Sequence, residues 1–127
     1  MIEKFSVMFL PEAVGFMNRL NIKSREKIYY NIRKAQVTED PVLFKKLNNT
    51  IWEFRTLYNK TYYRLFAFWD TTDKKQTLVF ITHGMIKKTG KAPASDLDRA
   101  ERIRLQYAEQ KAKDDTEKKK IKNRSTR

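Results

Sequence analysis

Three stretches with the pattern of β-strands follow one another in the middle of the chain, and they constrain the fold more than any other feature. Residues 51–57 alternate between two chemically different faces. Residues 62–69 are rich in aromatic side chains, and residues 76–82 have a similar strand-like composition after a polar link. Short links join antiparallel strands, whereas parallel strands need long crossovers, so we expect an antiparallel sheet here.

Two helical segments precede these strands. Residues 4–10 have a strand-like composition and end at Pro11, a residue suited to the first turn of a helix. Apolar residues then recur at helical spacing within residues 13–20 and again within residues 28–35. Ser24 is the expected cap of the second helix. The first part of the chain is therefore predicted to form a strand followed by two short helices.

The rest of the chain adds a connection and a last helix. Around Pro41 the helical pattern breaks, and we expect Phe44 and Leu47 to lie in a short packed turn. Apolar residues recur at nearly helical spacing from Leu97 to Tyr107, which predicts a C-terminal helix. The resulting order, β-α-α-β-β-β-α, favours an α+β fold over a doubly wound sheet. The first strand should lie beside the last one, and the first two helices should cover one face.

The charge of the chain is strongly and unevenly positive. Its 127 residues carry a formal net charge of +13, and residues 111–127 hold eight bases and three acids. We expect one domain at residues 1–112 and a basic, flexible tail at residues 113–127, which is either merely solvated or an arm that follows RNA. Such charge points to a polyanionic partner, with nucleic acid as the leading candidate and an anionic membrane surface as the competitor. No signal peptide or membrane span is recognisable.

Residue counts exclude several kinds of chemistry. The chain has no cysteine and one histidine, which argues against disulfides, thiolate metal sites and multi-histidine zinc sites. Its three glycines are far apart, so no phosphate-binding glycine loop can form. No serine lies in a nucleophile-elbow motif. We therefore expect no metal and no cofactor. We also expect a cytoplasmic location, with which the absence of cysteine is compatible.

A group of cations remains as the candidate site. Arg55 ends one predicted strand, Arg64 begins the next one beyond a short turn, and three bases follow the last strand, namely His83, Lys87 and Lys88. Side chains on one face of neighbouring antiparallel strands lie close together, and arginine binds phosphate through two parallel hydrogen bonds. Histidine exchanges protons near neutral pH. The alternative is that these cations are solvated charges of the sheet, balanced by Glu53 and Asp70.

These motifs resemble the phage-derived HigB-like branch of the RelE/ParE toxin superfamily. That branch has an L-W-E-L-R strand, an R-x-x-Y/F strand and a last strand that runs into H-G-F-x-K-K-T-x-K-x-P before a helix. The corresponding stretches are IWEFR at 51–55, YRL at 63–65 and ITHGMIKKTGKAP at 81–93. The resemblance covers roughly residues 1–110. It departs from the pattern at Ile51, Phe54 and Met85, where one apolar residue replaces another.

The resemblance implies the toxin of a type II toxin–antitoxin system, an endoribonuclease that cleaves mRNA on the ribosome and inhibits translation. The attacking group would be the 2′-hydroxyl of the message, without a metal. The implied partners are mRNA, ribosomal RNA and a helix-turn-helix antitoxin, with no membrane. By position, Arg55 and Arg64 would stabilise the scissile phosphate, Lys87 and Lys88 would stabilise charge or help to deprotonate the 2′-hydroxyl, and His83 is the candidate acid or base.

Other residues are expected to contact RNA or to form the core. The expected RNA contacts are Lys60, Tyr62, Lys91, Arg99 and Arg102. Tyr62 and Tyr63 either pack in the hairpin or offer a stacking surface for bases. Trp52 and Phe54 alternate away from Arg55 and are expected in the core.

Two other functions stay open. One is a ParE-type toxin that inhibits gyrase, which needs no convergence of cations on one phosphate. The other is a non-catalytic module that binds RNA or the ribosome.

Overall fold

The computed structural model of the chain describes residues 2–71, 77–87 and 92–125, with the backbone alone for residues 120–125. The elements are, in order, β1 (Ser6–Phe9), α1 (Pro11–Asn18), α2 (Ile22–Thr38), β2 (Phe44–Lys46), β3 (Trp52–Tyr58), β4 (Thr61–Trp69), β5 (Leu78–Lys87) and α3 (Ala94–Ser125). This order confirms the predicted α+β fold and adds one strand to the predicted series.

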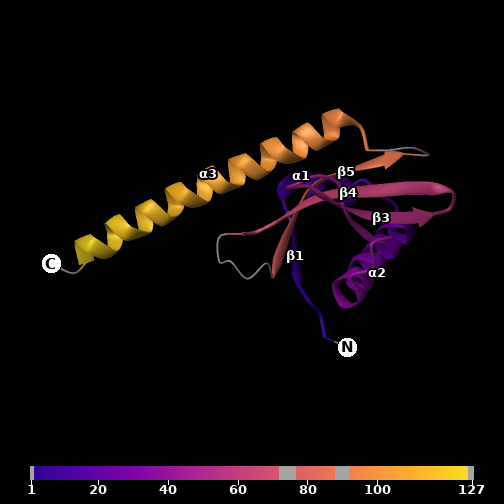
Figure 1. The fold of residues 1–127 in the computed structure, drawn as a ribbon, viewed down its shortest axis with the longest axis horizontal. Coiled ribbons are helices and arrows are strands. Elements are labelled where there is room, and N and C mark those ends of the chain that lie inside the picture. Colours follow the sequence, from indigo (N-terminus) through magenta and orange to yellow (C-terminus); the bar gives the residue numbers. More distant parts are fainter. Residues whose placement is uncertain (1, 72–76, 88–91, 126–127) are drawn as a thin grey trace.

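The strands form one sheet in the order β1-β5-β4-β3-β2. β1 runs parallel to β5, as predicted for a strand that joins the last one through a helical crossover, and the other neighbours are antiparallel. The helices α1 and α2 pack on one face of the sheet, and α3 crosses the other face before extending away from the body of the molecule (Figure 1). One face of the sheet is therefore covered by α1 and α2, and the other is covered in part by α3.

The strand β2 corrects the prediction of a packed turn after the second helix. Phe44 is buried as expected, at 4% exposure, and its ring stacks on that of Phe54 with 4.2 Å between centroids. However, residues Phe44–Lys46 pair with β3 and form the edge of the sheet. A strand of three residues is too short to show alternation, so the sequence pattern could not reveal it.

Strand alternation separates two clusters of apolar side chains. Trp52 and Phe54 face α1 and α2, where Phe54 is almost fully buried and Trp52 is half-buried, as predicted for core residues. On the opposite face, Phe66 and Phe80 pack beneath Ala100 of α3. The face that carries Phe66 also carries Arg64, because the two residues are separated by two positions on one strand.

A two-residue turn joins β3 to β4 and fixes the register of the hairpin. Asn59 and Lys60 both have positive φ angles, of 52° and 61°, which suits the tightest hairpin turns. The register places Arg55 directly opposite Arg64. The turn therefore sets the distance between the two predicted phosphate-binding arginines.

An irregularity in β5 decides where His83 lies. Phe66 pairs with His83, and Ala67 pairs with Ile81, so Thr82 is the extra residue of a bulge. The bulge places His83 on the α3 face. The next residue, Gly84, faces α1, where an added Cβ would overlap the ring of Phe16. Only glycine allows α1 to approach β5 this closely.

Two helix boundaries differ from the prediction. The helix α2 begins earlier, because the side chain of Asn21 accepts a hydrogen bond from the backbone N–H of Ser24, whereas the Ser24 hydroxyl bonds to the hydroxyl of Tyr63. The helix α3 continues through Ser125, beyond the last residue of the apolar pattern, and Leu105 within that pattern is 55% exposed. The domain boundary at residue 112 stays a prediction.

Candidate functional site

A pocket of about 480 Å³ lies between the edge of the sheet and the beginning of α3. We call it the arginine pocket, and its lining residues are Lys45, Lys46, Leu47, Glu53, Arg55, Arg64, Ala92 and Leu97. Among these are four cationic side chains and one carboxylate, so the pocket has an excess of positive charge. It is large enough for a phosphate group with part of its nucleotide.

Glu53 holds the two arginines of the pocket. One of its oxygens, Oε2, accepts a hydrogen bond from Nη1 of Arg64 at 3.2 Å. The other, Oε1, lies 3.0 Å from Nε of Arg55. Glu53 is 1% exposed and Arg64 is 3% exposed, whereas the Arg55 side chain keeps about a third of its surface in contact with solvent. The two guanidinium groups are thus fixed by one buried carboxylate, with Arg55 as the more accessible of the two.

The β2 lysines were not recognised in the sequence as site residues. Lys45 lies opposite Glu53 and Lys46 lies opposite Trp52, and both lysines are exposed. Their positions depend on the three-residue strand that the sequence pattern did not show. A pair of lysines directly after the packed Phe44 was the only available signal.

His83 lies on the same face as the two arginines and, like Lys87, is two positions from Met85, the β5 partner of Arg64, but its side chain is turned toward α3. It is 1% exposed, its ring stacks on Phe66, and it does not line the arginine pocket. Its Nδ1 lies 3.0 Å from the hydroxyl of Thr82, and its Nε2 lies 3.1 Å from a carboxylate oxygen of Asp96 at the start of α3. Burial lowers the pKa of His83, although the hydrogen bond to Asp96 acts in the opposite direction. In this arrangement His83 fixes α3 to the sheet.

Lys87 and Tyr62 lie on the arginine face but further along the hairpin. They are partners in the register of β4 and β5, and both are half-buried. Arg64 pairs with Met85, two positions before Lys87 on β5, so Lys87 is a diagonal neighbour of Arg64. Tyr63 points to the other face and is buried, which makes it a packing residue. Lys88 and Lys91 lie outside the described residues.

The remaining predicted RNA contacts are on the surface. Lys60 is exposed in the hairpin turn. Arg99 forms an exposed ion pair with Glu12 of α1, and Arg102 is exposed on α3. None of these three lines the arginine pocket. They are candidates for general attraction of nucleic acid rather than for chemistry at one phosphate.

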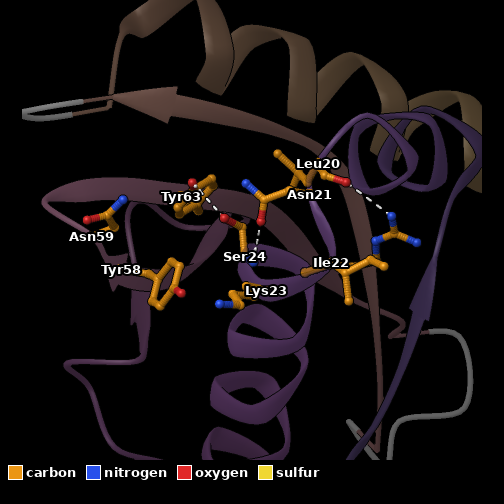
Figure 2. Close-up of a pocket in the computed structure, with 9 residues that line it drawn as sticks. Leu20, Asn21, Ile22, Lys23, Ser24, Tyr58, Asn59 and Tyr63 are labelled. Atoms are coloured by element: carbon orange, nitrogen blue, oxygen red, sulfur yellow. Dashed lines mark hydrogen bonds between the residues drawn. The ribbon is translucent and has the colours of Figure 1, made fainter.

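A second pocket, of about 730 Å³, lies at the start of α2 (Figure 2). Several of its polar groups are used internally: Ser24 bonds to Tyr63, Asn21 caps the helix, and Arg25 donates to the carbonyl oxygen of Leu20. It contains none of the predicted catalytic residues. The arginine pocket is therefore the better candidate for a reactive site.

Two further observations limit the chemistry. In the described part of the chain, no three of the His, Asp and Glu side chains come together as they would around a metal ion. Within the same residues, every helix is too short or too polar to cross a membrane.

Two solved structures are similar to this chain. The arginine-substituted E. coli toxin RelE in the free state matches with a TM-score of 0.56 and 18% identity, over 80% of this chain and 97% of that chain. The RelBE2 toxin–antitoxin complex from Mycobacterium tuberculosis matches with a TM-score of 0.49 and 17% identity, over 66% of this chain and 99% of that chain. No curated protein matches the sequence. The chain therefore has a RelE-like fold.

The sequence assigns the chain to a particular family. Residues 15–105 match the model of the family described as "Phage derived protein Gp49-like (DUF891)". The match covers most of the chain, and the protein belongs to this family. The family match agrees with the phage-derived toxin family that the sequence motifs resemble, and the fold is that of RelE.

Proposed function

We propose that this protein is the toxin of a type II toxin–antitoxin system and that it cleaves mRNA on the ribosome. The observation that carries the proposal is the pairing of Arg55 with Arg64 across β3 and β4, at an open pocket that also contains two lysines. Arginines that only keep a protein soluble are exposed, whereas Arg64 is 3% exposed beside an open, cationic pocket. Membership of the Gp49-like family and the fold shared with the toxin RelE support the same function.

The proposed reaction is an internal transesterification of RNA. The 2′-oxygen of one nucleotide forms a bond to the adjacent phosphorus while the bond from phosphorus to the 5′-oxygen of the next nucleotide breaks. The 2′-hydroxyl loses a proton to a base, and the departing 5′-oxygen gains one. The products are a 2′,3′-cyclic phosphate and a 5′-hydroxyl, so neither a metal nor a cofactor is consumed.

In this proposal the arginines stabilise the charge that develops on the phosphoryl oxygens. Arg55 is accessible enough to contact the scissile phosphate, and Arg64 acts from the base of the pocket. Glu53 is a positioning residue, because it fixes both guanidinium groups before RNA arrives. Lys45 and Lys46 attract the neighbouring phosphates.

Proton transfer is assigned to the end of β5. Lys87 is a diagonal neighbour of Arg64, and Lys88 follows it in the sequence, so these lysines are the proposed groups near the 2′-hydroxyl. A direct catalytic role of His83 stays a prediction, which its burial and its bonds to Thr82 and Asp96 make less favourable than a positioning role.

We further propose that the partners are ribosomal RNA and a helix-turn-helix antitoxin. The net charge of +13 suits the phosphate-rich surface of the ribosome. An antitoxin would neutralise the protein either by covering the arginine pocket or by preventing its entry into the ribosome.

The test is cleavage of a reporter mRNA in a cell-free translation system, with products mapped by primer extension and their ends identified chemically. We expect cuts only when ribosomes translate the message, with 2′,3′-cyclic phosphate and 5′-hydroxyl ends. Growth arrest with intact mRNA and supercoiling defects would replace the proposal by a gyrase inhibitor. Binding to ribosomes with neither cleavage nor arrest would replace it by a non-catalytic module.

A further inference from the structure

The two tryptophans of the chain form a pair beside the arginine pocket. Trp52 on β3 and Trp69 at the end of β4 are the only tryptophans in the sequence. Their ring centroids lie 6.1 Å apart, with the rings nearly perpendicular at 84°, and both side chains are half-buried. We call these residues the tryptophan pair. Both rings also pack against the core on the α1/α2 side of the sheet, and the exposed part of each indole is available to a ligand.

One hollow beside the pair is aromatic with a cationic rim. It has a volume of about 460 Å³, and Phe5, Phe44 and the tryptophan pair supply its rings. Phe44 stacks on Trp52 with 4.8 Å between centroids, so the rings support one another. Lys45, Lys46 and Glu39 line the same hollow, and Glu39 pairs with Lys4. Aromatic faces next to lysines match a nucleotide, whose base stacks and whose phosphate is anionic.

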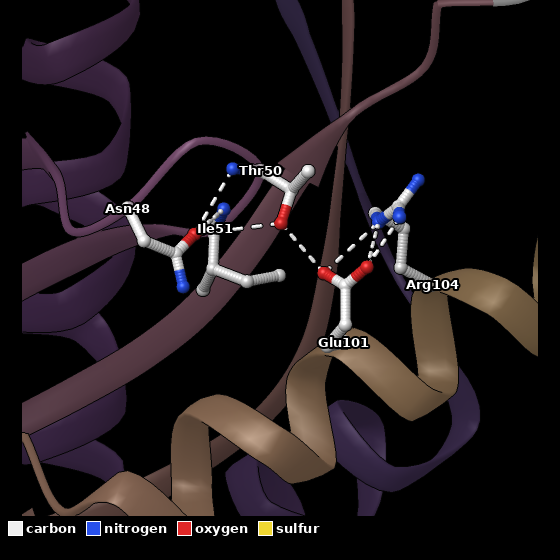
Figure 3. A network of polar contacts seen from close by, with 5 residues as sticks. All are labelled: Asn48, Thr50, Ile51, Glu101 and Arg104. Carbon is white, nitrogen blue, oxygen red and sulfur yellow. Dashed lines mark hydrogen bonds and ion pairs between the residues drawn. The ribbon is translucent and has the colours of Figure 1, made fainter.

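A smaller, polar hollow of about 190 Å³ lies on another side of the pair. Lys46, Asn49, Thr50 and Arg104 line it together with the tryptophans. Its walls are held by the network in Figure 3, in which the hydroxyl of Thr50 donates to Glu101 and the same carboxylate pairs with Arg104. Arg104 also lowers the pKa of Glu101, so this carboxyl group stays ionised near neutral pH. The loop before β3 is therefore fixed to α3.

The loop itself is folded by its own side chains. The side-chain oxygen of Asn48 accepts hydrogen bonds from the backbone N–H groups of Thr50 and Ile51, at 2.9 and 2.7 Å. These bonds set the start of β3 and with it the position of Trp52. The polar hollow is thus preorganised. Because Glu101 engages the Thr50 hydroxyl and the Arg104 guanidinium, the groups that the hollow offers to the edge of a base are the side-chain amide of Asn49 and the ammonium group of Lys46.

The tryptophan pair is continuous with the arginine pocket. Lys45 and Lys46 line both the aromatic hollow and the arginine pocket. Trp52 and Arg55 are separated by three strand positions, about 10 Å along β3, so their side chains point to opposite faces of the sheet. Beyond β3 the sheet has one more strand, the edge strand β2. A ligand therefore has to pass only β2 to go from one site to the other. A single strand of RNA can cross this edge and reach both.

We infer that the tryptophan pair is a subsite for one base of single-stranded RNA, next to the nucleotide whose phosphate occupies the arginine pocket. The inference rests on the proposed function, because it takes RNA as the substrate. The base stacks on the aromatic rings, its edge faces the polar hollow, and the β2 lysines hold the phosphate between the two sites. This subsite makes cleavage depend on the base beside the scissile bond.

Tryptophan emission tests the inference without requiring cleavage, since both tryptophans of the chain lie in the subsite. The probes are a 2′-O-methyl hexaribonucleotide, which cannot be cleaved because its nucleophile is blocked, and an abasic oligonucleotide with the same number of phosphates. Binding of each at low salt is followed independently by anisotropy of a label on the probe. We expect the base-containing probe to quench the emission and the abasic probe to bind without quenching.

Substitutions then assign the contact. Trp69→Leu should weaken binding of the base-containing probe about tenfold and leave the abasic probe unaffected, within the usual range for stacking on an aromatic residue. Tyr30→Leu is the matched control, because this aromatic side chain is 62% exposed on α2, and it should change neither affinity by more than about twofold. Trp52→Phe and Trp69→Phe keep an aromatic ring and show which indole is quenched if the leucine variant fails to fold.

The outcomes separate the inference from the proposed function. Bound probe without any change in emission, or equal quenching by the abasic probe, overturns the base subsite while leaving the arginine pocket as the phosphate site. Failure of both probes to bind at low salt contradicts RNA recognition itself, and the inference falls with it.

Discussion

The carboxylate of Glu53 lies 3.2 Å from the Nη1 atom of Arg64, and both side chains are almost completely buried at the base of a pocket that is otherwise cationic. A buried ion pair contributes little net stability, because desolvation of both charges offsets their attraction. Its value here is geometric. The pair holds a guanidinium group in one orientation beside the place where a phosphate would bind, and preorganisation of this kind is what stabilises a transition state.

Replacing Arg64 by Ala should reduce mRNA cleavage about a hundredfold, a loss on the order of 3 kcal/mol of transition-state stabilisation. Ribosome binding should change little, because most of the positive charge of the protein remains. The measurement is the rate of translation-dependent cleavage, with circular dichroism to establish folding. Arg33→Ala is the matched control, since this arginine is mostly exposed on α2 and pairs with Glu3. Equal cleavage by wild type and Arg64→Ala would remove the phosphate-binding role of this residue.

Replacing Glu53 by Gln should lower both stability and cleavage. Breaking a buried pair leaves charged groups without their partner, and the expected loss of unfolding free energy is on the order of 3 kcal/mol. The maximal rate of cleavage should fall more than the apparent affinity for RNA, because Arg55 and Arg64 remain but are no longer held by this carboxylate. Chemical denaturation and saturation kinetics measure the two effects. Glu109→Gln, which removes an exposed pair with Lys113, should cost less than about 0.5 kcal/mol.

His83 should make the protein less stable as the pH falls. Burial lowers its pKa below the ordinary histidine value of 6.5 in the folded state, so the unfolded chain takes up a proton first. The free energy of unfolding is therefore greatest above the unfolded pKa and declines as the pH falls from about 7.5 toward the folded pKa. Denaturation curves at several pH values measure this slope. Because the chain has one histidine, His83→Gln should flatten the slope below about pH 7.5.

The same variant separates two roles of the histidine. A mild loss of cleavage in folded His83→Gln fits a residue that positions α3 through Asp96. A loss as severe as that of Arg64→Ala, with a shifted pH profile, would restore direct proton transfer by His83.

The part of the site that lies on the sheet could be predicted from the sequence, because the residues that determine it are close together in the chain. Alternation in β3 places Glu53 and Arg55 on one face, and the two-residue turn at Asn59 fixes which residue of β4 lies opposite Arg55. Turn length and alternation can both be read from neighbouring residues. This is why the pairing of Arg55 with Arg64 could be expected before the structure was known.

The parts that could not be predicted depend on contacts between distant segments. Lys45 joins the pocket only because a three-residue strand pairs with β3. His83 is turned toward α3 by a one-residue bulge, and its partner Asp96 lies 13 residues further along the chain. The burial of Arg64 depends on the sheet and the start of α3 closing around it. No periodicity in the sequence encodes these relationships.

Removing residues 113–127 should leave the fold intact and weaken the attraction to RNA. Among the described side chains of α3, the last contacts with the rest of the domain are made by Tyr107, which packs on Phe80, and by Lys111, which pairs with Asp70 just after β4. Residues 112–119 are exposed, so their loss uncovers no core, and the melting temperature should shift by only a few degrees.

The charge effect of this truncation needs its own measurement. The removed segment has seven bases and three acids, so ribosome affinity should fall at low salt and its dependence on salt should become shallower. Replacing Lys113, Lys118 and Lys119 by Gln keeps the helix length and should reproduce part of that loss, which separates charge from shape. A drop in melting temperature of ten degrees or more on truncation would show that the end of α3 belongs to the folded domain. An unchanged salt dependence would show that the arm does not contact RNA and is simply solvated.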